Sequence, residues 1–532
     1  MRPSPRLGTL LGALVVLAGD AQPALAVDVV AYRFAFEVTD SDDLVRGDAQ
    51  LDVRLDGERT IELDLESMRT DGLGMRVGSV EWLPRGGEPI ALDYRHESSQ
   101  LHVSHPTWSG TVTVRVRYSG KPSDGFLIGV NRHGDRTFFA DHWPNRAHLW
   151  LPVVDHPSDK ALCSFDVTAP SHYQVVGCGA LREETDLGDG RRRTVWASRA
   201  PMATKVMAVG VARFAVETVG YVDDVPVQTW VFPQDREAGF SDYARALPVL
   251  HFFSEKIGEY PYSKLANVQS KTRWGGLENA SNVFYNETSV RGDGSSEGLI
   301  AHELAHQWFG DAVSESDWHH VWLSEGFATY LTQVYLEFAH GRDRMLSGME
   351  TARKRVLSYA RSNPDAKIID RTIEDPNRQL SAYTYQKGAW VLHMLRARMG
   401  DRAFFETLRT FYAMYRDANA STEDFIRIAE ASSGEDLTVF FAQWLERPGH
   451  PLLRVATREV EGRTEIVVQQ EQEGSFRFSV TIETVDAEGK TERQVLELSS
   501  PRAAVSVDGI GLTVRLDPDV ELLYETVPKP VR

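Results

Sequence analysis

Apolar and polar residues alternate along the first part of the chain, from Val27 to about Val216. Segments such as "YRFAFEVT", "AQLDVRLDG" and "TVTVRVRYSG" place an apolar residue at every second position between turn residues. A period of two is typical of strands that turn one face toward a core. The pattern predicts a large β-sandwich-like domain over residues 27–216.

The periodicity changes between residues 217 and 445. The strand-like segment "VQTWVF" precedes stretches in which apolar residues recur every three to four positions, including "SDYARALPVLHFFSEKIG", "SSEGLIAHELAHQWFG" and "LSEGFATYLTQVYLEFAHG". This spacing predicts helices, and we expect two of them to end at Gly341 and Gly400 because glycine commonly follows the last turn. The segment therefore reads as a mixed domain that begins with strands and continues with helices.

Alternation returns after "ERPGHP", in segments such as "TEIVVQQEQ" and "FRFSVTIETVD". Residues 446–532 are thus predicted to form a small C-terminal β-sandwich. The fold class expected for the whole chain is multidomain α+β.

Length and composition agree with this division. The chain has 532 residues, of which 42% are hydrophobic and 25% charged, as in ordinary soluble domains. At roughly 100–200 residues per domain, about three domains are expected. The formal net charge of −18 argues against nucleic acid as a partner and against docking on anionic lipid.

The N-terminus has the pattern of an export signal. Arg2 and Arg6 precede the short apolar run "TLLGALVVLAG", and "ALA" at residues 24–26 has the small residues of a cleavage site. We therefore expect a signal peptide over residues 1–26 and a periplasmic or extracellular mature protein, with a retained anchor as the alternative. The run is too short to span a bilayer, and no later stretch is long and apolar enough to do so.

Two cysteines, Cys163 and Cys178, lie in strand-like segments on either side of a turn that contains a proline. In an exported protein they could pair across a hairpin. Two buried thiols are the other possibility, and the sequence leaves both open.

The segment "EGLIAHELAHQWFGD" carries the candidate chemistry. His302 and His306 lie one helical turn apart, so both imidazoles project from one face of a helix. Glu303 lies about 100° around the helix, where it can act as a base without ligating a metal. Two solvated histidines on a surface helix would be the plain alternative, but the segment is apolar on most sides and buried histidines need partners.

A third metal ligand is needed for a catalytic zinc site. "VWLSEGFATYL" supplies Glu325 eighteen residues after His306, within an apolar run. A carboxylate in such a setting is costly unless it is paired or bound to a metal. An exposed glutamate in the first turn of a helix is the alternative.

Taken together, these motifs resemble the gluzincin zinc aminopeptidases, the family of aminopeptidase N and leukotriene hydrolase. "WGGLENAS" is similar to the family's exopeptidase motif, with Leu277 in place of methionine, and "YTYQKGAWVL" is similar to its catalytic tyrosine segment. The resemblance covers nearly the whole mature chain. It implies a thermolysin-like catalytic domain over residues 217–445, in a short form without the large C-terminal helical domain of many relatives.

The resemblance also implies the metal and the catalytic groups. His302, His306 and Glu325 match the ligands of one Zn²⁺ per chain. Glu303 matches the general base, and Tyr385 matches the tyrosine that stabilises the oxyanion. Tyr383, two residues earlier, is its rival.

Substrate recognition follows from the same motifs. Glu278 matches the glutamate that anchors the free α-amine, and the backbone of Gly275 and Gly276, with Asn279 completing the motif, should lie along the peptide.

A second amine contact is common in relatives on the β domain. A count without gaps places Asp141 and Trp143 at the two positions concerned, so Asp141 is the candidate carboxylate and Trp143 could shape the first pocket.

The expected partners are peptides with a free N-terminus. Two other functions stay open: a catalytically silent peptide-binding scaffold, and a zinc endopeptidase or epoxide hydrolase on the same fold. The sequence does not indicate the oligomeric state or the preferred first residue.

Overall fold

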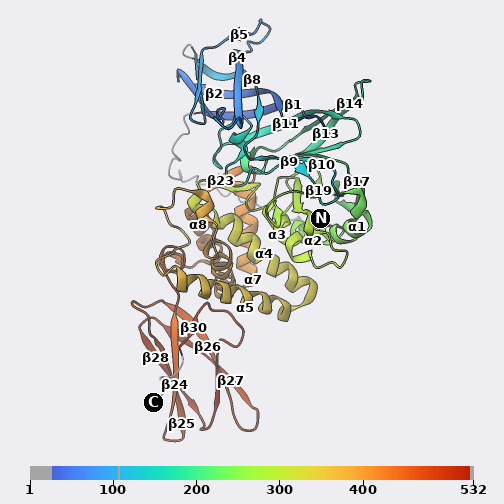
Figure 1. Cartoon of the computed structure of the whole chain (residues 1–532). Helices are drawn as coiled ribbons and strands as arrows, with labels where there is room; N and C mark the ends of the chain where they lie inside the picture. The colour runs from blue at the N-terminus through green and yellow to red at the C-terminus, as the bar shows by residue number, and fades with distance from the viewer. Residues whose placement is uncertain (1–26, 106–107, 528–532) are drawn as a thin grey trace, which may run out of the picture.

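The computed structural model describes residues 27–105 and 108–527, which form three consecutive parts along an elongated molecule (Figure 1). The β-rich N-terminal part and the small β-rich C-terminal part lie at opposite ends of a central part that holds the helices. The predicted signal peptide, residues 1–26, lies outside the described residues. Within the described ranges, no helix combines the length and the apolar composition needed to cross a membrane.

The largest N-terminal sheet has the strand order β13-β14-β11-β1-β2-β8-β4-β5, with β15 paired to β11. Its strands are β1 (Asp28–Glu37), β2 (Val45–Asp56), β4 (Gly74–Trp82), β5 (Ile90–Ala91), β8 (Ser109–Lys121), β11 (Lys160–Pro170), β13 (Ala180–Asp186), β14 (Arg191–Ala197) and β15 (Met202–Ala203). Strand β2 buries every second residue from Val45 to Leu55, as the alternation predicts.

Two smaller sheets complete this part. The first has the order β12-β16-β10-β9 and the second β3-β7-β6. Their strands are β3 (Thr60–Asp64), β6 (Tyr94–Glu97), β7 (Gln100–Ser104), β9 (Phe126–Val130), β10 (Arg136–Ala140), β12 (Gln174–Gly177) and β16 (Val209–Ala212).

Cys163 and Cys178 are buried free thiols, so the disulfide does not form and the second possibility holds. The backbone N–H of Ala208 donates to Cys178 Sγ over 3.0 Å. Burial raises the pKa of the Cys178 thiol to about 11. A buried thiol in its neutral form is inert, so this cysteine has a packing role.

The central part opens with a mixed sheet of order β17-β18-β19-β21-β20, in which β18, β19 and β21 run parallel. These strands are β17 (Ala215–Val222), β18 (Val225–Val231), β19 (Leu265–Ser270), β20 (Gly276–Leu277) and β21 (Asn282–Asn286). The predicted domain boundary at residues 216 and 217 falls inside β17. The two-residue strand β20 is an edge of the sheet and pairs only with β21.

The helices follow. They are α1 (Arg236–Tyr243), α2 (Ala246–Lys256), α3 (Glu297–His306), α4 (Trp322–His340), α5 (Arg342–Ser362), α6 (Pro376–Gln379), α7 (Gly388–Tyr415), α8 (Thr422–Ser433) and α9 (Thr438–Phe441), and β22 (Val313–Glu315) pairs with β23 (Ala418–Ala420) between them. Gly341 ends α4 at φ 87°, as expected. Gly400 breaks α7 at φ 78° and a second helical run follows directly, so the pattern located the break but not the continuation.

The C-terminal part consists of two sheets, of order β28-β25-β24-β30 and β27-β26-β29. Their strands are β24 (Leu452–Val460), β25 (Arg463–Gln470), β26 (Phe478–Val485), β27 (Thr491–Leu498), β28 (Arg502–Asp508), β29 (Thr513–Leu516) and β30 (Glu525–Thr526). The predicted fold class, multidomain α+β, is confirmed.

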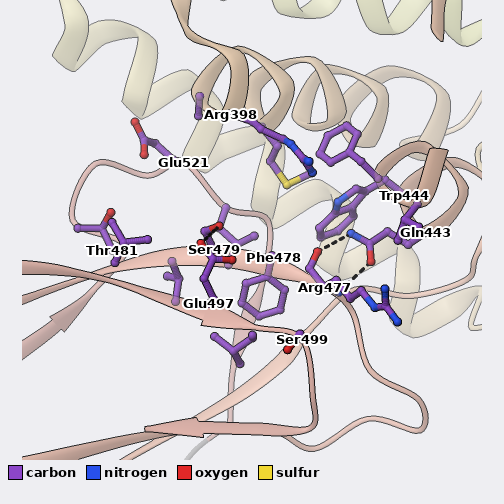
Figure 2. Close-up of a pocket in the computed structure, with 18 of the residues that line it drawn as sticks. Arg398, Gln443, Trp444, Arg477, Phe478, Ser479, Thr481, Glu497, Ser499 and Glu521 are labelled. Carbon is purple, nitrogen blue, oxygen red and sulfur yellow. Dashed lines mark hydrogen bonds between the residues drawn. The ribbon is translucent and has the colours of Figure 1, made fainter. Parts of the chain in front are cut away.

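A cavity of about 680 Å³ separates α7 and α9 from β26 and β27 (Figure 2). At one end of it, the Gln443 side chain donates to the Arg477 carbonyl over 2.7 Å and accepts from the Arg477 N–H over 2.9 Å. This paired hydrogen bond ties the C-terminal sandwich to the helical part.

Two lysines, the half-buried Lys160 and the buried Lys205, join the N-terminal part to the central part. Lys160 on β11 donates to the carbonyls of Asp311, Ala312 and Ala418 over 2.7–2.9 Å. Lys205, in the turn Thr204–Val206, forms a buried ion pair with Glu315 at 2.6 Å. These hydrogen bonds and the buried ion pair therefore restrain the relative position of the two parts.

Replacing Lys160 with methionine should test this junction. The change removes three hydrogen bonds that the ammonium donates, whereas Ser314 Oγ and the Asp417 N–H still donate to the Asp311 and Ala312 carbonyls, so we expect a loss of about 3 kcal/mol in the free energy of unfolding. Urea unfolding followed by tryptophan fluorescence measures the loss. Lys121→Met is the matched control, because the Lys121 side chain is exposed and makes no hydrogen bond to the described residues; equal midpoints for the two variants would contradict the expectation.

Candidate active site

A cleft of about 230 Å³ opens where β20, α3, the start of α4 and the π-helical turn Tyr383–Lys387 meet. It brings together most of the residues that the sequence singled out. Its lining consists of Trp143, Trp274, Gly275, Gly276, Leu277, Glu278, Leu299, His302, Glu303, His306, Glu325, Leu380 and Tyr385.

Three candidate ligand atoms form a compact triangle in this cleft. His302 Nε2 and His306 Nε2 are 3.2 Å apart, and Glu325 Oε2 lies 3.5 Å from the first and 3.3 Å from the second. Ligands of a tetrahedral ion at about 2.1 Å are separated by about 3.4 Å, so the triangle fits zinc. In the described part of the chain, buried Glu325 Oε2 has no hydrogen-bond partner, which leaves it available to a metal.

Neighbouring groups orient these ligands. His306 Nδ1 lies 3.2 Å from the Phe309 carbonyl and 3.0 Å from Ser324 Oγ, so a proton on Nδ1 leaves Nε2 free for a metal. The Tyr385 hydroxyl donates to Glu325 Oε1 over 2.8 Å and so fixes the carboxylate from the opposite side.

The charges of the cleft favour a cation at its floor. Burial raises the pKa of Glu325, but His306 and His302 outweigh burial and hold that pKa well below its usual range. Burial alone would lower the pKa of His306. The Glu325 and Glu278 carboxylates outweigh burial and raise this pKa to about 10. Burial, together with the same two carboxylates, raises the pKa of Glu303 well above its usual value, against the opposing effect of His306.

Glu303 projects from α3 toward the edge strand β20. A Cβ at Gly276 would overlap the Glu303 carboxylate, whereas a Cβ at Gly275 would lie in ordinary contact, 3.8 Å from Leu299 Cδ1. Glycine at position 276 is thus what lets the strand approach the glutamate. Gly275 and Gly276 both line the cleft, and β20, which contains Gly276, is the last strand of its sheet.

Glu278 lies buried in the cleft, and the Trp143 indole N–H donates to its Oε1. The backbone of this segment is held from α3 by Gln307, whose side chain donates to the Glu278 carbonyl over 2.7 Å and accepts from the Ser281 N–H over 2.8 Å. Sequence analysis missed Gln307. Its polar side chain on a buried helix, next to His306, was the available sign that it needs a partner.

Three of the other candidates do not line the cleft. Asp141 is fully buried and its carboxylate accepts from Arg146, from Thr272 Oγ1 and from the Arg273 N–H, so the structure does not support it as an amine contact. Trp143, two residues later in the same loop, lines the cleft instead, because its side chain points in a different direction from that of Asp141.

The remaining two are buried elsewhere. Asn279 is 1% exposed and its side chain makes no hydrogen bond to the described residues. Tyr383, the rival of Tyr385, packs on Tyr359 with ring centroids 5.1 Å apart. Of the two tyrosines, Tyr385 is the one that reaches the cleft.

Comparison with known proteins agrees with this geometry. The Peptidase M1 N-terminal domain matches residues 30–206 and the Peptidase family M1 domain matches residues 243–444. The chain belongs to the peptidase M1 family. The resemblance drawn from the motifs is thereby confirmed.

Relatives of this family differ in their names and in their length. The chain is 25% identical over 449 residues to a leucyl aminopeptidase of Saccharolobus solfataricus, covering 79% of this chain and 53% of that one. It is 26% identical over 336 residues to a glutamyl aminopeptidase of Mus musculus, covering 60% and 35%. The chain spans about half the length of the curated relatives it matches first.

Solved structures show the same fold. A mutant M1 zinc metallopeptidase from Deinococcus radiodurans, bound to a Tyr-Ser-Ala substrate, matches with a TM-score of 0.67 and 25% identity, over 80% of this chain and 95% of that one. Aminopeptidase A of Legionella pneumophila, in complex with aspartic acid, matches with a TM-score of 0.81 and 17% identity, over 96% and 60%. Family membership implies zinc, and the triangle of ligand atoms fits it.

Metal binding should raise the melting temperature of the protein. A ligand that binds only the folded state at about 1,000 times its dissociation constant stabilises it by about 4 kcal/mol. We therefore expect a chelator to lower the melting temperature and one equivalent of zinc to restore it. His302→Ala should abolish the response, whereas His251→Ala, at an exposed histidine of α2, should keep it; a response retained by His302→Ala would contradict the site.

Proposed function

We propose that this chain is a zinc-dependent aminopeptidase that removes N-terminal residues from peptides, with one zinc per chain. The observation that supports it best is the position of Glu278, a buried carboxylate that shares the cleft with His302, His306 and Glu325. A metal triad alone is compatible with many hydrolases. A carboxylate beside it supplies a partner for a free α-ammonium group.

The zinc held by His302, His306 and Glu325 would supply Lewis-acid polarisation of the scissile carbonyl and activation of water. Glu303 takes the proton of the attacking water and delivers it to the leaving amine nitrogen, and burial, by raising the pKa of Glu303, strengthens it as the proton acceptor.

With substrate bound, Tyr385 would turn its one hydroxyl proton from Glu325 Oε1 to the oxygen on which negative charge develops. Burial and the nearby Glu325 carboxylate raise the pKa of Tyr385 well above its usual value, so its hydroxyl stays protonated and can donate.

Recognition of the peptide uses the edge of the sheet. The backbone of Gly275 and Gly276 can pair with an extended substrate as an added strand would, and Glu278 at the end of β20 then receives the α-amine. The distance from Glu278 to the triad would fix cleavage after the first residue.

Export is a further part of the proposal. The charged start, apolar run and small residues of positions 1–26 support a cleaved signal peptide and a periplasmic or extracellular location.

The alternatives differ in what they require of the cleft. A catalytically silent scaffold has no use for the complete set of triad and base, which this chain keeps. An endopeptidase or an epoxide hydrolase has no use for an amine-binding carboxylate at Glu278.

Aminoacyl-aminomethylcoumarins and their N-acetylated forms separate these functions. We expect hydrolysis of the free-amine set alone, lost on chelation, because the acetyl group removes the charge that Glu278 binds. Glu303→Ala should keep its zinc and lose turnover, since only the proton acceptor is removed. Equal cleavage of blocked substrates would reject the exopeptidase, and absence of turnover with stoichiometric zinc would favour the scaffold.

Tyr385→Phe should lower kcat by about 10²–10³, the usual loss when one oxyanion donor is removed. Tyr383→Phe is the matched control, because the same atom is removed from a ring that does not line the cleft. Steady-state kinetics on one free-amine substrate decide between them. If Tyr383→Phe causes the larger loss, the assignment of Tyr385 is wrong.

A further inference from the structure

Trp143 comes from the N-terminal part, yet its ring forms a wall of the cleft. It lies between β10 and the turn Ala147–Leu149, and only 4% of it is exposed. The ring packs on Trp318 with centroids 5.5 Å apart, and the Lys205 ammonium lies 5.2 Å from its centroid. Since Lys205 is itself fixed by the buried ion pair with Glu315, the indole is held in one orientation.

That orientation points the indole N–H at the amine-binding candidate. Trp143 donates to Glu278 Oε1, and within the described residues no other side chain donates a hydrogen bond to that carboxylate. An indole N–H is only a donor, so the bond stabilises the ionised carboxylate and leaves Oε2 for a substrate group.

The rest of the cleft wall is apolar. Apart from the triad, Glu303, Tyr385 and Glu278, the described lining has no ionisable side chain; it consists of Trp143, Trp274, Gly275, Gly276, Leu277, Leu299 and Leu380. A charged first side chain would find no partner of its own against this wall, and an unpaired charge is costly to bury.

The charges already present in the cleft strengthen this point. When all three are ionised, Glu278, Glu303 and Glu325 would carry three negative charges, which a divalent zinc and the ammonium of the substrate would balance. A glutamate or lysine side chain at the first position would add a charge that nothing in the lining compensates.

We propose that Trp143 is a positioning and specificity residue, which orients Glu278 for the α-amine and forms the apolar wall that selects peptides with an apolar first side chain. The proposal rests on the aminopeptidase function given above and names its substrate class.

Binding to the zinc-loaded Glu303→Ala protein tests it without turnover, by calorimetry. Leu-Ser-Ala should bind at least tenfold more tightly than Glu-Ser-Ala and Lys-Ser-Ala, since one methylene in an apolar pocket already discriminates about tenfold or more. Leu-Ser-Ala should also bind more tightly than its des-amino analogue, 4-methylpentanoyl-Ser-Ala. Trp143→Phe keeps an apolar ring and removes the N–H, so it should reduce this amine-dependent ratio by about tenfold.

Trp82→Phe is the matched control, because it makes the same change in a tryptophan of β4 that does not line the cleft; its ratio should stay that of the parent. Equal affinity for the charged peptides overturns the selectivity, and an unchanged ratio in Trp143→Phe overturns the positioning role. The peptide series on the parent protein decides the first point even if Trp143→Phe does not fold. If the parent itself gains nothing from the amine, the aminopeptidase proposal fails instead.

Discussion

Three glutamate side chains share one buried cleft, and the structure around it offsets the free-energy cost of placing them together. An isolated carboxylate in the interior is costly, and two histidines at the same place cannot neutralise three of them. The pKa of His306, raised to about 10 by Glu325 and Glu278, shows how strongly the site attracts positive charge. A divalent ion satisfies this demand better than a proton, because it can bind His302, His306 and Glu325 at once. The apolar flanks of α3 and α4 then exclude water and keep the electrostatic interactions strong.

The N-terminal part supplies one wall of that cleft, so its position relative to the helices matters for chemistry. Buried ion pairs contribute little net stability, because desolvation opposes the attraction, but breaking one is strongly destabilising. Lys205–Glu315 and the three carbonyl bonds of Lys160 therefore act mainly as constraints on how the two parts dock. A small displacement there would move Trp143, and with it the carboxylate of Glu278.

The candidate site was predictable where its geometry is local. The i, i+4 spacing of His302 and His306 fixes their relation within one helix, and Glu325 stood out because a carboxylate in an apolar run needs a partner. Positions set by loops were not predictable, because a loop has no period from which a side-chain direction follows. Asp141 and Trp143 are two residues apart, and only the fold shows that Arg146 binds the first and that the second enters the cleft.

For the strands, the alternation predicted which side chains face the core. It could not predict the order of strands within a sheet, which depends on pairings such as β1 with β11 across more than a hundred residues.

Relatives named leucyl and glutamyl aminopeptidases match this chain with nearly the same identity, so family membership does not determine the first residue of the substrate. The determinant must lie in residues that vary around a common centre. In this chain those residues are Trp143, Leu277, Leu299 and Leu380. Their side chains present apolar surface to the substrate and carry no charge. A second carboxylate in place of the indole would bind the α-amine directly. An indole instead binds the one carboxylate already present, so the amine is recognised through a single, well-oriented group and the space beside it is left to an apolar side chain.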